Sequence, residues 1–92
     1  MRFEWDAKKA LSNLNKHGVS FEEASSVFYD ELSRTVVDPF CLATELRFLT
    51  LGMAKTSRLL LVVHLEEHDD LIRIVSARPA TNAERVKYES YR

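Results

Sequence analysis

The sequence predicts an α+β domain with an antiparallel four-stranded sheet, a short additional N-terminal strand, an N-terminal helical hairpin and a C-terminal helix. Three observations indicate this class. Two segments with helix-capping signals lie near the N-terminus, four strand-like segments joined by short links follow, and a capped segment closes the sequence. The 92 residues are 46% hydrophobic and 29% charged, which is typical of a single domain over residues 1–92.

The first part of the chain is expected to form a short strand and a helix. The segment RFEW alternates apolar and polar residues and precedes Asp6, whose carboxylate is a good helix N-cap. Gly18 suits the left-handed conformation that commonly ends a helix, so we expect a helix over residues 7–17. The apolar residues of this helix recur at helical spacing: Ala7, Ala10, Leu11 and Leu14.

A second helix is expected after a tight turn. Ser20 and Glu23 have the spacing of a capping box, and Val19 and Ala24 have the spacing of a hydrophobic staple. These signals predict a helix over residues 21–29. Because the turn is short, the two helices are expected to form a hairpin.

The sequence then changes to strand periodicity. Four runs rich in β-branched, aromatic and aliphatic residues are separated by polar links, which favours an antiparallel meander. The run LLLVV is apolar on both faces of the strand, so this strand is expected to be central, with helices over at least one side. The expected strands are residues 33–38, 46–53, 58–65 and 71–78.

A final helix is expected over residues 82–91. Pro79 lacks a backbone N–H and ends the last strand. Thr81 and Glu84 repeat the capping-box spacing directly after that proline. The first turn of this helix therefore follows closely on Arg78, the last residue of the expected strand.

Charge is distributed unevenly along the chain, although the net charge is only −1. Residues 1–17 carry four Lys or Arg and two Asp or Glu, residues 18–71 carry four and ten, and residues 72–92 carry five and two. Both ends are thus basic, at +2 and +3, around a middle segment of −6. If the ends meet in the fold, they create a local positive field that attracts anionic partners; ordinary scattered surface charge is the alternative.

Residue content excludes several kinds of site. Cys41 is the only cysteine, so neither a disulfide nor a cysteine zinc cluster is expected, and a reducing cytoplasm is the expected location. No apolar run is long enough for a membrane span. The three histidines lack the spacing of a metal site and the two glycines form no phosphate-binding loop, so we expect no metal and no cofactor.

A cationic site without a metal is what remains. Lys16 and His17 end the first helix, where the helix dipole favours cations; a purely structural cap and a proton-transferring His17 are both open interpretations. RNA suits such a site because its 2′-hydroxyl is a built-in nucleophile. The enzyme has only to deprotonate that hydroxyl, neutralise the phosphorane and protonate the leaving 5′-oxygen.

Arginine and aromatic side chains are the other candidates. Arg47 and Arg73 lie on expected strands, where an arginine either extends its stem over the core or binds a phosphate through two parallel hydrogen bonds. Arg78 is better placed for an anion, because it ends a strand just before a helix N-terminus. Trp5 either packs in the core or stacks on an unpaired base.

Three separated segments resemble the BrnT-type toxins of type II toxin-antitoxin systems. FEWDAKKALSNLNKHGVSFEEASSVF resembles the family's opening strand, its W-D pair, its N-x-x-K-H-G helix and its V-S-F-E-E-A helix. LRFLTLG resembles the family's R-F strand, and IRIVSARPATNAERVKY resembles its S-A-R strand with the helix that follows. The resemblance spans nearly the whole chain.

This resemblance implies a RelE-like fold and an endoribonuclease that cleaves RNA without a metal and inhibits translation. It implies a BrnA-type ribbon-helix-helix antitoxin as partner, in an expected 2:2 complex, with DNA reached only through the antitoxin. The residues that match family motifs and are expected to be catalytic are Lys16, His17, Arg47 and Arg78. Those expected to bind substrate are Trp5 and Ser76, which match motifs, and Arg73.

The expected site requires residues that are distant in the sequence to lie close together in the fold. Residues 16, 17, 47 and 78 are far apart in the sequence and are expected to converge in one cationic pocket. Two other functions stay open at this point: an inactive relative that serves only as the antitoxin's partner in repression, and a small RNA-binding protein that does not cleave.

Overall fold

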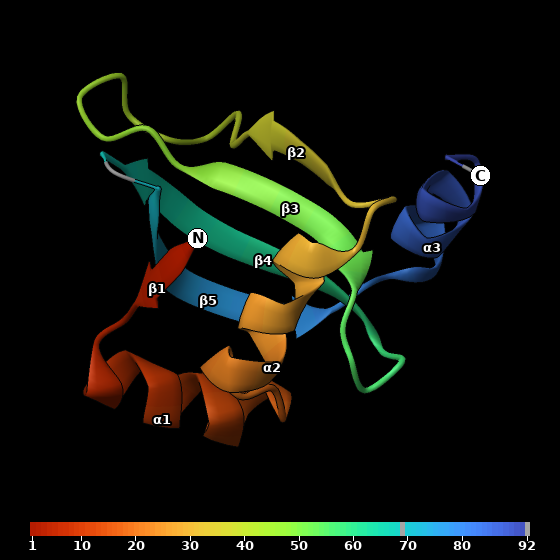
Figure 1. Ribbon diagram of the computed structural model, residues 1–92, viewed down its shortest axis with the longest axis horizontal. Helices are drawn as coiled ribbons and strands as arrows, with labels where there is room; N and C mark the ends of the chain where they lie inside the picture. Colours follow the sequence, from red (N-terminus) through yellow and green to blue (C-terminus); the bar gives the residue numbers. More distant parts are fainter. Residues whose placement is uncertain (69, 92) are drawn as a thin grey trace.

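The computed structural model describes residues 1–68 and 70–91 and contains one five-stranded sheet with helices on both faces (Figure 1). The chain forms a short strand, two helices, a 3-10 helix and four strands before it ends in a helix. In chain order the elements are β1 (Arg2–Glu4), α1 (Ala7–His17), α2 (Phe21–Ser25), the 3-10 helix η1 (Ser26–Tyr29), β2 (Arg34–Val37), β3 (Phe48–Met53), β4 (Leu59–Glu67), β5 (Leu71–Pro79) and α3 (Asn82–Glu89).

The strand order in the sheet is β1-β5-β4-β3-β2. Strands β2 to β5 form the antiparallel meander that the sequence predicts. The N-terminal strand corrects the predicted four-stranded antiparallel sheet, because β1 pairs in parallel with β5, from Arg2 opposite Leu71 to Glu4 opposite Arg73. The sheet is therefore mixed. Alternation in RFEW indicates a strand, but alternation alone fixes neither the partner of a strand nor its direction.

The helices also differ from the prediction. The second helix is α-helical only over Phe21–Ser25 and continues as η1, because the hydroxyls of Ser25 and Ser26 donate to carbonyls three residues back and compete with the α-helical ladder. The expected helical hairpin is not a paired unit, since α1 and α2 each pack mainly on β5. The last helix ends at Glu89, two residues earlier than expected.

The main core lies between the sheet and the layer of α1, α2 and η1. Alternate residues of the central strand β4 point to opposite faces, as its apolar sequence predicts. One face joins the main core, whose buried members are Val19, Phe21, Ala24, Val27, Ala54, Leu60, Val62, Ile72, Ile74 and Ala77. The other face carries a smaller cluster, in which Leu51 and Leu59 of the sheet pack with Tyr88 of α3.

Candidate active site

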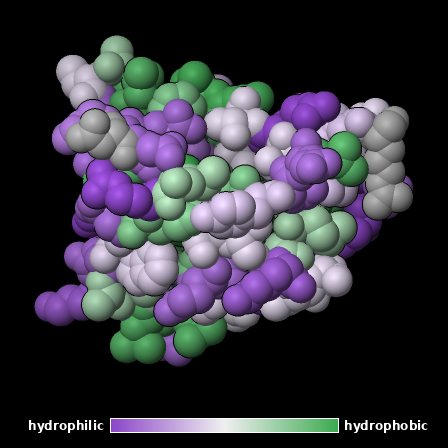
Figure 2. Space-filling view, in the orientation of Figure 1, coloured by the Kyte–Doolittle hydropathy of each residue, from purple (hydrophilic) through white to green (hydrophobic). Residues whose placement is uncertain are grey.

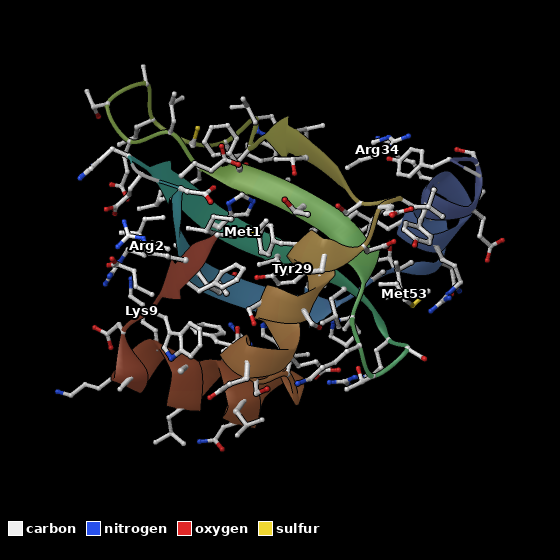
Figure 3. The ribbon with its side chains drawn as sticks, in the orientation of Figure 1. Met1, Arg2, Lys9, Tyr29, Arg34 and Met53 are labelled. Atoms are coloured by element: carbon white, nitrogen blue, oxygen red, sulfur yellow. The ribbon has the colours of Figure 1, made fainter. Side chains whose placement is uncertain are left out.

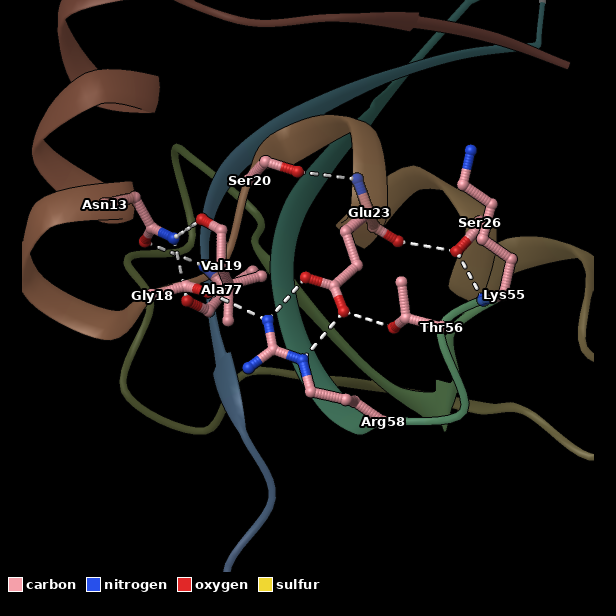
Figure 4. A network of polar contacts seen from close by, with 10 residues as sticks. All are labelled: Asn13, Gly18, Val19, Ser20, Glu23, Ser26, Lys55, Thr56, Arg58 and Ala77. Atoms are coloured by element: carbon pink, nitrogen blue, oxygen red, sulfur yellow. Dashed lines mark hydrogen bonds and ion pairs between the residues drawn. The ribbon is translucent and has the colours of Figure 1, made fainter.

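Helix α1 is attached to β5 by one buried side chain. The amide of Asn13 donates from Nδ2 to the carbonyl oxygens of Val19 and Ala77, at 2.9 Å each, and its Oδ1 accepts from the Ala77 N–H at 3.0 Å (Figure 4). Because β1 pairs only with the first three residues of β5, Asn13 takes the place of a neighbouring strand further along that edge. The end of α1 is thereby fixed against the S-A-R segment.

A hollow of about 200 Å³ lies between α1 and this edge of β5. Three residues predicted from the sequence contribute to it, namely Lys16, His17 and Ser76. The strand is irregular here: Val63 pairs with Ser76 and His64 with Ile74, so one residue of β5, Val75, lacks an opposite partner. A bulge of this kind re-aims side chains and is common beside active sites. The full lining is Lys9, Ser12, Asn13, Lys16, His17, Val75 and Ser76.

Lys9, Ser12 and Asn13 were not predicted to belong to the site. Their signal was present in the sequence, because positions 9, 12, 13 and 16 follow the i, i+3, i+4, i+7 spacing of one helix face. Asn13 is also the first residue of the N-x-x-K-H-G pattern. That spacing, applied to polar residues instead of apolar ones, would have identified the face.

The hollow is cationic. Within the part of the chain that the structure describes, the side chains of Lys9, Lys16 and His17 have no hydrogen-bond or ion-pair partner. No carboxylate is among the residues that line the hollow. Lys16 and His17 lie in the last turn of α1, where the partial negative charge of the helix end stabilises cations. The two basic ends of the chain do meet here, since α1 and β5 belong to opposite ends of the sequence.

The turn after His17 is held by a charged pair. Gly18 ends α1 in the left-handed conformation with φ of 69°, and its carbonyl accepts from Nη2 of Arg58 at 2.8 Å. Arg58 also donates from Nε to the carboxylate of Glu23 at 2.8 Å, and Thr56 donates to the same carboxylate (Figure 4). The hydrogen bond from Arg58 lowers the pKa of Glu23 against the opposing effect of burial. This pair connects the β3–β4 turn to the end of α1.

The two arginines of β5 are engaged by carboxylates. Arg78 donates from Nη1 and Nη2 to both oxygens of Glu84, at 2.8 and 2.9 Å. This hydrogen bonding raises the pKa of Arg78 and lowers the pKa of Glu84. Arg73 forms an ion pair with Glu4 on the neighbouring strand. Arg78 therefore already uses both of its Nη groups on a carboxylate, whereas Arg73 contacts Glu4 through Nη1 alone.

The predicted convergence of residues 16, 17, 47 and 78 is not found. Arg78 lies opposite Leu61, which in turn lies opposite Leu51, whereas Arg47 precedes the other end of β3. Arg78 is thus level with Leu51, four residues beyond Arg47, so the two arginines are about 13 Å apart along the strand direction. Residues 16 and 17 share the hollow with Ser76, and neither Arg47 nor Arg78 lines it. The antiparallel register separates the two arginines, and a sequence pattern does not specify register.

The remaining candidates, Arg47 and Trp5, lie elsewhere. Nε of Arg47 is buried and has no hydrogen-bond partner among the described residues. Trp5 packs edge-on against Phe21, with ring centroids 5.9 Å apart, and belongs to the border of the main core. The packing alternative that the sequence left open for Trp5 is therefore the one that its contacts support.

Two further structural findings concern the described residues only. No three His, Cys, Asp or Glu side chains within residues 1–68 and 70–91 cluster in a way that would hold a metal ion. The helices in these ranges are too short and too polar to cross a bilayer.

The chain has relatives among known proteins. The sequence pattern of a family described as "Ribonuclease toxin, BrnT, of type II toxin-antitoxin system" matches residues 5–84. No curated protein matches the chain. Among solved structures, the chain is similar to the crystal structure of the ribonuclease toxin BrnT of Brucella abortus, with a TM-score of 0.64 and 21% identity over 89% of this chain and 99% of that one. The structural likeness supports the fold, and the match over residues 5–84 supports the family: this chain belongs to the BrnT family of ribonuclease toxins of type II toxin-antitoxin systems.

Proposed function

We propose that this protein is an endoribonuclease that cleaves RNA without a metal, acts in the cytoplasm and inhibits translation. The observation that carries the proposal is the hollow beside the β5 bulge, where Lys9, Lys16 and His17 lie without partners among the described residues. A cluster of unpaired cations suits a phosphodiester. Family membership adds that the activity of these toxins is directed at RNA.

The proposed reaction uses the 2′-hydroxyl of the substrate. The 2′-oxygen attacks the adjacent phosphorus while its proton passes to a base, the bond from phosphorus to the 5′-oxygen breaks, and that oxygen takes a proton from an acid. The products are a 2′,3′-cyclic phosphate and a 5′-hydroxyl. His17 is assigned proton transfer, because imidazole exchanges protons near neutral pH. Lys16 and Lys9 are assigned to the charge that develops on the non-bridging oxygens.

The arginines are assigned to the phosphates around the scissile one. Arg78 follows Ser76 by two residues on β5, about 7 Å along the strand, and its guanidinium is held by Glu84 of α3; it is assigned to a phosphate next to the scissile one. Ser76 is assigned a hydrogen bond to the substrate. Arg47 and Arg73 lie toward the other end of the sheet, and they are assigned to nucleotides further along the strand of RNA.

The proposed partner is a BrnA-type ribbon-helix-helix antitoxin. Membership of a type II toxin-antitoxin family supports an antitoxin. The 2:2 stoichiometry and contact with DNA only through the antitoxin are proposed from the family resemblance. In this scheme the antitoxin neutralises the ribonuclease by keeping RNA away from the hollow.

Cleavage by the purified protein tests the proposal. The protein is expected to cut RNA in excess EDTA, to leave 2′,3′-cyclic phosphate ends and to spare DNA of the same sequence. His17→Gln is expected to lower the rate about 100-fold and Lys16→Ala by a factor of about 10 to 100. Lys55→Ala removes an exposed lysine outside the hollow and serves as the matched control, with no expected change.

Two results would contradict this assignment. Undiminished cleavage by His17→Gln would remove His17 from proton transfer. An absence of cleavage by the parent protein, combined with tight antitoxin binding, would instead favour an inactive relative that serves only as the antitoxin's partner.

A further inference from the structure

Helix α1 has its amphipathic pattern reversed. Leu11 and Leu14 are 61% and 46% exposed, whereas the one buried residue of the helix is the polar Asn13. Figure 3 shows side chains of α1 reaching away from the sheet, and Figure 2 shows hydrophobic surface along the lower edge of the view, where Figure 1 places α1. The two leucines are three residues apart and therefore neighbours on the helix surface. The two leucines do not pack in the core, so packing within the fold does not account for apolar residues at these positions.

A second hollow lies on this outer side. It has a volume of about 500 Å³ and is lined by Lys8, Leu11, Ser12, Asn15 and Lys16. Ser12 and Lys16 also line the hollow of the candidate active site. A molecule bound to the outer side of α1 therefore contacts a residue of the active site.

The charge of α1 indicates what binds there. The helix contains Lys8, Lys9, Lys16 and His17 and no acidic residue. A second copy of this chain would bring like charges together if it packed α1 against α1. RNA would be attracted by the lysines, but its binding would not account for two exposed leucines. An acidic segment with apolar side chains matches both features of the surface.

We propose that the outer face of α1, defined as Lys8, Leu11, Ser12, Leu14, Asn15 and Lys16, binds an acidic amphipathic helix of the cognate antitoxin. The inference rests on the proposed function only for the existence of that antitoxin. The 11 residues of α1 span about 16 Å, which matches about three turns of a partner helix. Lys8 and Lys16 are about 12 Å apart along the axis, so the partner carries carboxylates at a similar separation around a central apolar pair.

In this arrangement the antitoxin inhibits the toxin by covering the active-site hollow. A helix seated on Leu11 and Leu14 places its acidic end over Lys16, at the entrance to the hollow that is proposed to hold the scissile phosphate. RNA and the antitoxin then compete for the same lysine. Inhibition follows without any change in the fold of the toxin.

A second exposed apolar segment provides the comparison. Residues 36–46 cover the end of the edge strand β2 and the segment after it, and they include Leu42 and Leu46, which are 69% and 53% exposed. Charges of both signs flank them, including Arg34, Asp38 and Glu45. Charge therefore does not specify a partner for this segment as it does for α1.

Binding and cleavage measured on the same variants test the proposal. The probe is the antitoxin encoded beside the toxin gene, and its Kd is measured by calorimetry with the free toxin. The double variant Leu11→Ser/Leu14→Ser is expected to bind the antitoxin at least about 30-fold more weakly, because both apolar anchors of the proposed helix contact become polar. Its RNA cleavage without antitoxin is expected to stay within about twofold of the parent.

The matched control is Leu42→Ser/Leu46→Ser, which removes the same side chains from the other apolar segment and is expected to leave the Kd unchanged. Lys8→Glu provides a second variant: it is expected to weaken antitoxin binding, and an acidic-to-lysine change in the antitoxin is expected to restore it.

Parent-like affinity in the α1 double variant overturns the proposal, as does a loss of affinity confined to the Leu42/Leu46 variant. A loss of RNA cleavage with unchanged antitoxin affinity would assign the face to RNA. A toxin that binds in this pattern but cuts no RNA would contradict the proposed function alone.

Discussion

The replacement Asn13→Ala tests whether one side chain attaches α1 to the sheet. The amide of Asn13 is 6% exposed and makes three hydrogen bonds, to the carbonyls of Val19 and Ala77 and from the Ala77 N–H. Alanine removes all three and leaves those backbone groups without their partner. At about 1 kcal/mol for each bond, the expected loss is about 3 kcal/mol in the free energy of unfolding.

That loss is a large share of the total, because domains of this size are stable by about 5 to 15 kcal/mol. It corresponds to a fall in Tm of about 15 °C. Urea denaturation followed by circular dichroism measures the free energy, and a thermal melt checks the Tm. Cleavage of RNA by Asn13→Ala is also expected to fall at temperatures where the protein stays folded, since Lys16 and His17 lose their fixed position against Ser76.

Asn15→Ala is the matched control. Asn15 is exposed, lies in the same helix and forms no side-chain hydrogen bond with β5, and alanine favours a helix slightly more than asparagine does. The control is expected to change stability by less than about 0.5 kcal/mol. If Asn13→Ala costs less than about 1 kcal/mol, or no more than Asn15→Ala, the reasoning about the β5 edge is refuted.

Three further predictions concern pH, charge and close packing. Burial lowers the pKa of His64 to about 4. Between about pH 6.5 and 4 the unfolded chain therefore binds more protons than the folded protein. The free energy of unfolding is expected to fall by about 3 kcal/mol as the pH drops through that window. Glu84→Gln keeps the helix-capping geometry but weakens the hold on Arg78, so RNA is expected to bind a few-fold more tightly in a filter-binding assay. Gly52→Ala is expected to lower stability by about 2 kcal/mol in urea denaturation, because the new Cβ would lie 2.7 Å from Cγ1 of Val27.

Each of these has a result that would contradict it. Replacement of His64 by Gln should remove the pH dependence between pH 6.5 and 4, and an unchanged pH profile in that variant would assign it to other groups. Unaltered RNA affinity in Glu84→Gln would show that Arg78 takes no part in binding. Gly18→Ala is the control for Gly52, since a Cβ there meets nothing within 4 Å and only the positive φ opposes it; a greater loss at Gly18 would contradict the packing argument.

The prediction of the last helix succeeded because its signal is local. Thr81 accepts from the Glu84 N–H while the Glu84 side chain accepts from the Thr81 N–H, so the capping box read from four residues is closed in the structure. The similar spacing of Ser20 and Glu23 was only half realised. Ser20 accepts from the Glu23 N–H, but the Glu23 carboxylate turns to Arg58, 35 residues away. A distant partner with a full charge outcompetes a backbone amide.

The proximity of some candidate site residues could be predicted for a similar reason, whereas their roles stay a prediction. Lys16, His17 and Ser76 do share a hollow, as the family motifs suggest, and Lys16 and His17 are adjacent residues at the end of one helix. Arg78 does not line this hollow, and its guanidinium is bound to Glu84 across the strand-to-helix turn. Apolar spacing indicated the helix but not which way its apolar residues face, and Leu11 is exposed.

The sequence by itself determined where the helices and strands begin, the meander of four strands, and the family to which the chain is similar. These features depend on capping residues, alternation and turns, whose interactions span only a few positions along the chain. Tertiary structure decided that β1 joins β5 in parallel, that a buried Asn13 replaces a strand at that edge, and that the arginines lie at separate levels of the sheet. Those outcomes depend on strand register and on contacts between residues more than 60 positions apart, and many registers satisfy the same local pattern.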